Sequence, residues 1–83
     1  MRTKALELCK SLRSGDSIVC GESPVWIRQE LLTRLDHLLM ETDDINLKDA
    51  IESFSVGAAR FISDSCGSEC DALLDAIGTL TDA

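Results

Sequence analysis

Apolar side chains recur at intervals of three and four residues along most of this 83-residue sequence, which is the spacing of one face of an α-helix. The glycines at positions 15, 21, 67 and 78 and the single proline interrupt this pattern. We therefore predict an all-α fold, a small compact bundle of about four short amphipathic helices over residues 3–13, 24–40, 46–64 and 69–81. A chain of this length, residues 1–83, is expected to form a single helical domain.

The apolar faces of the predicted helices supply the expected core. The face of the second helix is the widest, at roughly 140°, which is more than a coiled-coil seam requires. The four faces consist of Ala5, Leu8, Cys9 and Leu12; of Ile27, Leu31, Leu32, Leu35, Leu38 and Leu39; of Leu47, Ile51, Phe54, Ala58, Phe61 and Ile62; and of Cys70, Leu73, Leu74, Ile77 and Leu80. Because the chain has only three aromatic residues, the core is expected to be mainly leucine and isoleucine.

Start and stop signals locate the first two helices. Gly15 is expected to end the first helix, since glycine accepts the left-handed conformation at no steric cost. Ser23 is a good N-cap, and Pro24 suits the first helical position because its missing N–H has no partner there. Residues 14–22 are predicted to be a loop in which the apolar segment 18–20 covers the core.

The starts of the last two helices are marked by polar residues. Asp43, Asp44 and Asn46 are all candidates for the N-cap of the third helix, and Asn46 with Asp49 resembles a capping box. The fourth helix is expected to begin at Ser68, after a helix-breaking glycine. Its polar side is expected to carry Asp71, Asp75 and Asp82.

Acidic side chains are concentrated in the second half of the sequence. Residues 1–40 hold six basic and five acidic residues, whereas residues 41–83 hold two basic and ten acidic, and the whole chain carries a net charge of −7. Direct binding of nucleic acid is not expected, because a phosphate backbone needs a basic surface. The acidic half either keeps the protein in solution or approaches a basic surface on a partner. The basic first helix and the acidic half are expected to attract each other, either between the two chains of a homodimer or within one chain.

Two absences from the sequence suggest a location. No run approaches the ~18 apolar residues that a membrane span needs. The basic residues at the start are followed by alternating apolar and charged residues, without the apolar region of a secretory signal. We expect a cytoplasmic protein, in the producing cell or its host, that makes no membrane contact. In that compartment the four cysteines are expected to be free thiols.

Cys66 and Cys70 form a Cys-x-x-x-Cys pair, whose spacing allows a shared metal ion or a disulfide. A structural zinc site takes four ligands, and Cys9, Cys20 and His37 do not have the spacing of a second ligand pair. The favoured interpretation makes Cys9 and Cys70 small buried apolar residues, with no cofactor. A thiol or zinc-binding protein that uses Cys66 and Cys70 is an alternative.

Trp26 is expected to project away from the leucine face of its helix, on the same side as Glu30 and His37. It either packs against the first helix or segment 18–20, or serves as an exposed anchor for a partner. Val56 is a weaker case of the same kind, because it lies opposite the apolar face of the third helix.

Small residues on the third helix would let another helix approach closely. They are Ala50, Ser53, Gly57 and Ala58. Packing within the chain is the favoured interpretation, and packing against a second copy is the alternative.

No set of residues suited to catalysis is apparent, because His37 has no candidate nucleophile and orienting group beside it. We therefore predict a non-enzymatic regulatory module that acts by binding a protein partner. The candidate contact residues are Trp26, Glu30, His37, Val56, Asp71 and Asp75. The size and acidity of the chain resemble the small inhibitor proteins of phages and mobile elements, including anti-CRISPR proteins. Such an inhibitor would cover a basic nucleic-acid-binding surface.

Overall fold

The computed structural model describes residues 2–81, and within them it contains helices and no strand. The α-helices are α1 (Arg2–Ser14), α2 (Ser17–Cys20), α3 (Val25–Glu41), α4 (Asp44–Ser65) and α5 (Asp71–Gly78). Two 3₁₀ turns, η1 (Ser68–Cys70) and η2 (Thr79–Thr81), flank α5. The predicted small all-α bundle is confirmed, and the four longer helices overlap the four predicted segments.

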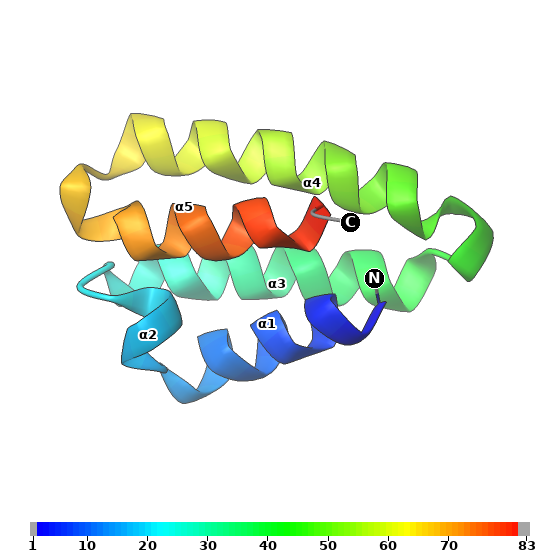
Figure 1. The fold of residues 1–83 in the computed structure, drawn as a ribbon, viewed down its shortest axis with the longest axis horizontal. Helices are drawn as coiled ribbons and strands as arrows, with labels where there is room; N and C mark the ends of the chain where they lie inside the picture. The colour runs from blue at the N-terminus through cyan, green and yellow to red at the C-terminus, as the bar shows by residue number, and fades with distance from the viewer. Residues whose placement is uncertain (1, 82–83) are drawn as a thin grey trace.

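The long helices lie side by side and run in alternating directions (Figure 1). α3 packs against α1 and α4, while α5 and η2 pack against α4, and α2 contacts α1 and α5. The α3–α4 connection lies at one end of the bundle, and α2 and the α4–α5 turn lie at the other (Figure 1). The molecule measures 34 × 23 × 22 Å along its principal axes.

The core is aliphatic, as the composition predicts. The side chains with an exposed fraction of 2% or less, apart from the cysteines, are Ala5, Ile27, Leu31, Leu35, Ile51, Ala58, Ile62, Leu73, Ile77 and Leu80. Leu8, Cys9, Leu12, Cys20, Leu39, Leu47 and Cys70 complete the buried set. The other members of the predicted apolar faces are only partly buried, namely Leu32, Leu38, Phe54, Phe61 and Leu74. Both phenylalanines therefore lie at the margin of the core.

The start of α3 corrects a predicted cap, and the start of α4 selects Asp43 from the three candidates. Pro24, not Ser23, occupies the N-cap position of α3, where no side chain caps the helix. The buried hydroxyl of Ser23 instead donates to the carbonyl oxygen of Cys20 at 2.6 Å. At the start of α4, Asp43 is the N-cap and accepts a hydrogen bond from the backbone N–H of Asn46 at 3.2 Å. Asn46 thus lies inside the first turn, and the capping box predicted for it does not form.

The segment predicted as a loop contains the single turn α2. Gly15 ends α1 with φ +73°, as predicted, and the carboxylate of Asp16 then accepts from the N–H of Ile18 at 2.9 Å. Cys20 is buried, so it does cover the core, but Ile18 is 84% exposed, so that part of the prediction is wrong. One helical turn is too short to show a repeat of three or four, which explains why the apolar pattern missed it.

The fourth predicted helix is divided into three pieces. The helical segment begins at Ser68 after Gly67, as predicted, but its first three residues form η1. The α-helix begins only at Asp71, and residues 79–81 tighten into a second 3₁₀ turn. Asp82, predicted for the polar side, lies outside the described residues. No helix within residues 2–81 is both long enough and apolar enough to cross a membrane.

Candidate functional site on the α3–α4 surface

Trp26, near the start of α3, packs its ring on α4. The indole meets the ring of Phe61 edge-on, with the ring centroids 5.9 Å apart and the planes at 86°. Trp26 still leaves 55% of its surface exposed. The sequence suggested packing on α1 or segment 18–20, or exposure for a partner, and gave no indication of this ring partner on α4. Antiparallel packing brings the two rings together, because it sets the start of α3 beside the end of α4 (Figure 1).

Glu30 and Arg34 continue this contact along α3. The Nε of Arg34 donates to Oε1 of Glu30 at 2.9 Å, as expected for residues one helical turn apart. The guanidinium carbon lies 4.9 Å from the ring centroid of Phe61, a cation–π geometry. Glu30 therefore orients Arg34, and Arg34 and Trp26 both contact the ring of Phe61. The sequence pointed to Trp26 and Glu30 and missed Arg34, although the Glu-to-Arg spacing of four was available as a signal.

An open groove of about 500 Å³ adjoins this cluster between α3 and α4. Its lining residues are Arg34, Leu38, Thr42, Ala50, Ser53, Phe54, Gly57 and Ala58. Arg34 belongs both to the groove and to the aromatic contact, so the two features form one continuous region. We call the lining residues together with Trp26, Glu30 and Phe61 the α3–α4 surface.

The small residues of α4 lie along this groove, where they leave space. Ala58 is 2% exposed, so the expected close packing within the chain holds for this residue. Gly57 is exposed, and a Cβ built on it would meet nothing within 4 Å. No neighbouring element of the described chain therefore requires a glycine at this position.

His37 lies on the same side of α3 as Trp26 and Glu30, because these positions fall on one helical face. Its Nε2 lies 3.0 Å from Oε2 of Glu41, and both side chains are exposed. An exposed pair one turn apart contributes only about 0.3–0.5 kcal/mol. His37 is therefore a polar residue at the edge of the site.

The other three candidate residues lie away from this region. Val56 is 72% exposed but does not line the groove. Asp71 and Asp75 are exposed on α5, and neither forms a salt bridge with another described residue. The structure thus leaves Trp26, Glu30 and His37 on one face of α3, and Val56, Asp71 and Asp75 on other helices.

The basic first helix and the acidic half meet within one chain at Arg2. Its guanidinium pairs with the carboxylate of Asp44 at 2.9 Å. The same group donates to the carbonyl oxygens of Leu39 and Thr42 at 3.2 and 3.1 Å. Arg2 therefore links α1 to the α3–α4 connection through these bonds, at the end of the groove opposite Trp26.

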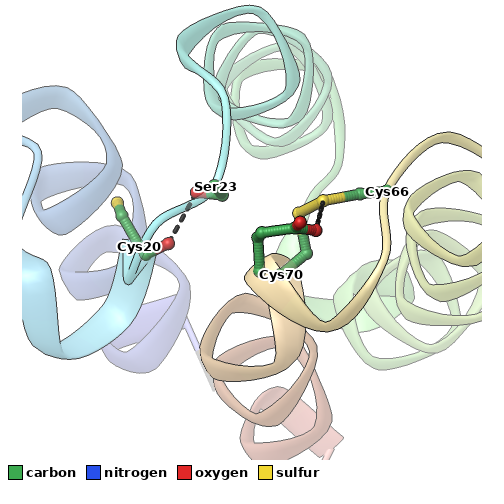
Figure 2. The surroundings of a disulfide bond; sticks show 5 residues. Cys20, Ser23, Cys66 and Cys70 are labelled. Carbon is green, nitrogen blue, oxygen red and sulfur yellow. Dashed lines mark hydrogen bonds between the residues drawn. A yellow bond between two sulfur atoms is a disulfide. The ribbon is translucent and has the colours of Figure 1, made fainter.

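Cys66 and Cys70 are joined by a disulfide, with their Cα atoms 6.1 Å apart (Figure 2). Cys66 is the C-cap of α4, and Cys70 is buried at the start of α5. The expectation of four free thiols is therefore wrong for this pair, and Cys70 is more than a small buried apolar residue. The spacing of the two cysteines in the sequence allows the bond, but the expected cytoplasmic location favoured free thiols.

Cys9 and Cys20 are free and buried. Burial, reinforced by the neighbouring carboxylate of Asp36, raises the pKa of Cys9 to about 11, although Arg13 lowers it in part. Burial also raises the pKa of Cys20, and the nearby guanidinium of Arg28 opposes that shift. Both thiols therefore stay protonated at neutral pH.

Within residues 2–81 no group of three or more His, Cys, Asp and Glu side chains is arranged to hold a metal ion. The sulfurs of Cys66 and Cys70, while bonded to each other, offer no thiolate to zinc. The chemistry that the α3–α4 surface offers is an aromatic anchor, a cation and an open, partly apolar groove.

Comparison with known proteins returns no relative from which a role could be transferred. No protein-family model, no curated protein and no solved structure matches the chain.

Proposed function

We propose that this protein is a non-enzymatic binding module that recognises a protein partner through the α3–α4 surface. The observation that carries the proposal is Trp26, whose indole is fixed by Phe61 and yet is 55% exposed. Tryptophan and arginine are enriched among the residues that dominate binding energy, and a side chain held in place loses little entropy on binding. Arg34 gives the surface a charged donor at the point where the aromatic contact joins the groove.

The shape of the groove favours a macromolecular partner. Sites for small molecules are concave and enclose most of the ligand, whereas this groove is open to solvent. A groove between two antiparallel helices suits an amphipathic helix whose apolar face lies along it. Direct binding of nucleic acid is disfavoured by the net charge of −7.

The proposal is tested with Trp26→Ala. Wild type and variant, each immobilised, are used to capture proteins from an extract of the producing cell, and the captured proteins are then titrated individually. We expect Trp26→Ala to lower affinity at least tenfold. Leu6→Ala on α1 is the matched control, because Leu6 is 52% exposed and lies outside the α3–α4 surface. A partner held equally by all three proteins would place the interface elsewhere.

A second copy of the chain is the competing occupant of the groove. Sedimentation equilibrium of wild type and Trp26→Ala separates the two cases. A wild-type dimer that dissociates in the variant would show that a second copy occupies the groove. A wild-type protein that is monomeric at all concentrations would support a different protein as the occupant.

A second candidate function is an acidic inhibitor that covers a basic nucleic-acid-binding surface. It is favoured by exposed carboxylates in the second half that form no salt bridge with a described residue. These belong to Asp49, Glu52, Asp64, Asp71 and Asp75. Binding of this kind weakens steeply between about 50 and 500 mM salt, because exposed charges are screened. Binding that resists salt but is lost in Trp26→Ala would reject the inhibitor and support the groove.

The proposal keeps the cytoplasmic location expected from the sequence, in the producing cell or its host. A disulfide in that compartment is reduced by cellular thiols and is transient rather than permanent. In an oxidising compartment the Cys66–Cys70 bond would persist. The redox state of the pair in freshly lysed cells, trapped by alkylation, therefore tests the location.

A further inference from the structure

The disulfide at the α4–α5 turn joins two cysteines that differ in burial. Cys70 has an exposed fraction of 0%, whereas Cys66 is partly exposed at the end of α4. Exchange begins when a thiolate attacks one sulfur of a disulfide, and access decides which sulfur is attacked. Only Cys66 can be approached from solvent without unfolding the start of α5.

A carboxylate stands beside this accessible sulfur. Oε2 of Glu69 lies 3.9 Å from Sγ of Cys66, in an exposed setting. A bonded sulfur carries no proton, so this contact is not a hydrogen bond. It places a negative charge close to the sulfur that an anionic thiolate has to approach. Gly67 makes room for it, because a Cβ at Gly67 would come within 3.2 Å of the same carboxylate oxygen.

The remaining thiols do not compete for the bond. Cys9 and Cys20 are buried, and burial raises the pKa of both, so neither supplies a thiolate at neutral pH. The side chain of Cys20 points away from the disulfide in Figure 2, and its sulfur lies 3.8 Å from the carbonyl oxygen of Ser11 on α1. An attacking thiol must therefore come from another molecule.

We propose that the Cys66–Cys70 bond is a thiol–disulfide exchange site that is attacked at Cys66 and guarded by the charge of Glu69. The reductant is an external dithiol. Its thiolate bonds to Sγ of Cys66, the S–S bond breaks, and the electron pair leaves on Sγ of Cys70, which then takes a proton from water. The second thiol of the reductant loses its proton to water, and its sulfur bonds to the first sulfur of the reductant. The mixed disulfide breaks, and its electron pair leaves on Sγ of Cys66, which takes a proton, so the reductant ends as a disulfide and the protein gains two thiols.

The start of α5 assists the leaving group. Cys70 is the N-cap of this eight-residue helix and its side chain makes no capping hydrogen bond. The positive end of the helix dipole favours an anion at that position, while the burial of Cys70 and the neighbouring carboxylates of Glu69 and Asp71 act against it. Attack at Cys66 thus places the departing thiolate at the favourable end of a helix.

Reduction is expected to loosen the contact between α2 and the α4–α5 turn. A Cβ at Gly21 would lie 3.2 Å from Cβ of Ala72 and 3.7 Å from the carbonyl oxygen of Glu69, so the turn lies close against α2. Without the bond, the turn loses its covalent cross-link to α4 and is held by the chain itself and by core packing. This role does not depend on the partner-binding function proposed for the α3–α4 surface.

The first experiment counts thiols in the protein after equilibration with oxidised dithiothreitol. Alkylation under denaturing conditions, read by intact mass, is expected to label two cysteines before reduction and four afterwards. Labelling of all four before reduction would overturn the proposal, because the bond would then not form.

The second experiment measures the rate at which the folded protein is reduced by glutathione, which is anionic, and by cysteamine, which is cationic. We expect Glu69→Gln to speed the glutathione reaction by about three- to fivefold at low salt. The same variant leaves the cysteamine reaction unchanged or slower. Glu52→Gln, which removes an equal charge from the exposed side of α4, is the matched control and should change neither rate.

The third experiment locates the attack. Brief exposure to glutathione, an acid quench and fragmentation of the peptide that holds both cysteines should place the adduct on Cys66. An adduct on Cys70, or equal acceleration by Glu69→Gln and Glu52→Gln, would overturn the proposal. Hydrogen exchange should rise on reduction in residues 17–23 and 67–72, and an unchanged pattern would remove the coupling to α2.

Discussion

α4 contacts its two neighbours in different ways, and the difference separates the part of the molecule that holds the fold from the part available for binding. Toward α5 and η2 the core contains Leu73, Ile77 and Leu80, which are at most 2% exposed. Toward α3 the contact contains Leu38 and Phe54, which are partly buried and line an open groove. A short chain buries a limited share of its surface, and its apolar volume fills one interface more completely than the other.

The largest expected effect compares two leucines of α3. Leu35 is 0% exposed, whereas Leu38, nearly one turn later, lines the groove. Truncating a fully buried leucine removes its contacts and leaves a cavity, so Leu35→Ala should lower the free energy of unfolding by about 3–4 kcal/mol. Leu38→Ala should lower it by about 1 kcal/mol, because one side of the residue already faces open space. Urea unfolding measures both, and equal losses would mean that the groove is closed in solution.

The fold follows from the sequence wherever a helix is long enough to show its period. Ile27, Leu31, Leu35 and Leu39 repeat every four residues, and all of them are buried. α2 has four residues, fewer than the period needs, so local capping by Asp16 decides its structure instead. Ser23 has the right chemistry for a cap but uses its hydroxyl for a buried bond to the preceding turn, a choice that depends on tertiary packing.

The candidate site was predictable only in part. The position of Trp26 off the leucine face follows from helical geometry. Its ring partner, Phe61, is 35 positions away in the sequence, and no local pattern links them. Prediction of the Cys66–Cys70 disulfide failed for another reason. The spacing of the two cysteines allowed the bond, but the expected cytoplasmic location favoured free thiols. The helices that carry a site are therefore easier to predict than the contacts between them.

The second effect concerns the α1–α3 side of the core. Cys9 is 3% exposed, and burial raises its pKa from 9.0 to about 11. Between those values the unfolded chain loses the thiol proton while the folded chain keeps it, so stability is full below pH 9 and falls as pH rises toward 11. We expect a loss of about 1–3 kcal/mol over this range.

Urea unfolding at pH 8 and pH 10.5 measures this loss in wild type and in Cys9→Ala. The variant should start less stable at pH 8 but decline less steeply, because the raised thiol pKa is gone. Cys20, whose pKa shifts the same way, is present in both proteins and cancels in the comparison. If the free energy of unfolding fell equally with pH in the two proteins, water would reach Cys9. The α1–α3 side of the core would then be open to solvent, as the groove is.

The third effect tests the close contact at the α2 end. Gly21 has φ +54°, and a Cβ there would lie 3.2 Å from Cβ of Ala72. Gly21→Ala combines a left-handed backbone with a tight contact, so we expect thermal unfolding to report a loss of about 1–2 kcal/mol. A neutral result would show that α2 moves away from α5 without loss, and the end of the bundle near the disulfide would then be no tighter than the groove.

The smallest effect has the opposite sign and lies in the groove. Gly57 is in the interior of α4 with an ordinary helical backbone, and a Cβ there would meet nothing within 4 Å. Because alanine restricts the unfolded chain more than glycine does, Gly57→Ala should raise the free energy of unfolding by about 0.5–1 kcal/mol. Glycine is therefore not required here by the fold of this chain. If a partner helix lies along the groove, the added methyl group should weaken its binding while the protein itself becomes more stable.

Gly78→Ala on α5 is the control, since its Cβ would also meet nothing within 4 Å and it does not line the groove. It should leave partner affinity unchanged. A Gly57→Ala protein that is less stable than wild type would show that α3 and α4 approach more closely in solution, and the contrast between the two sides of α4 would disappear.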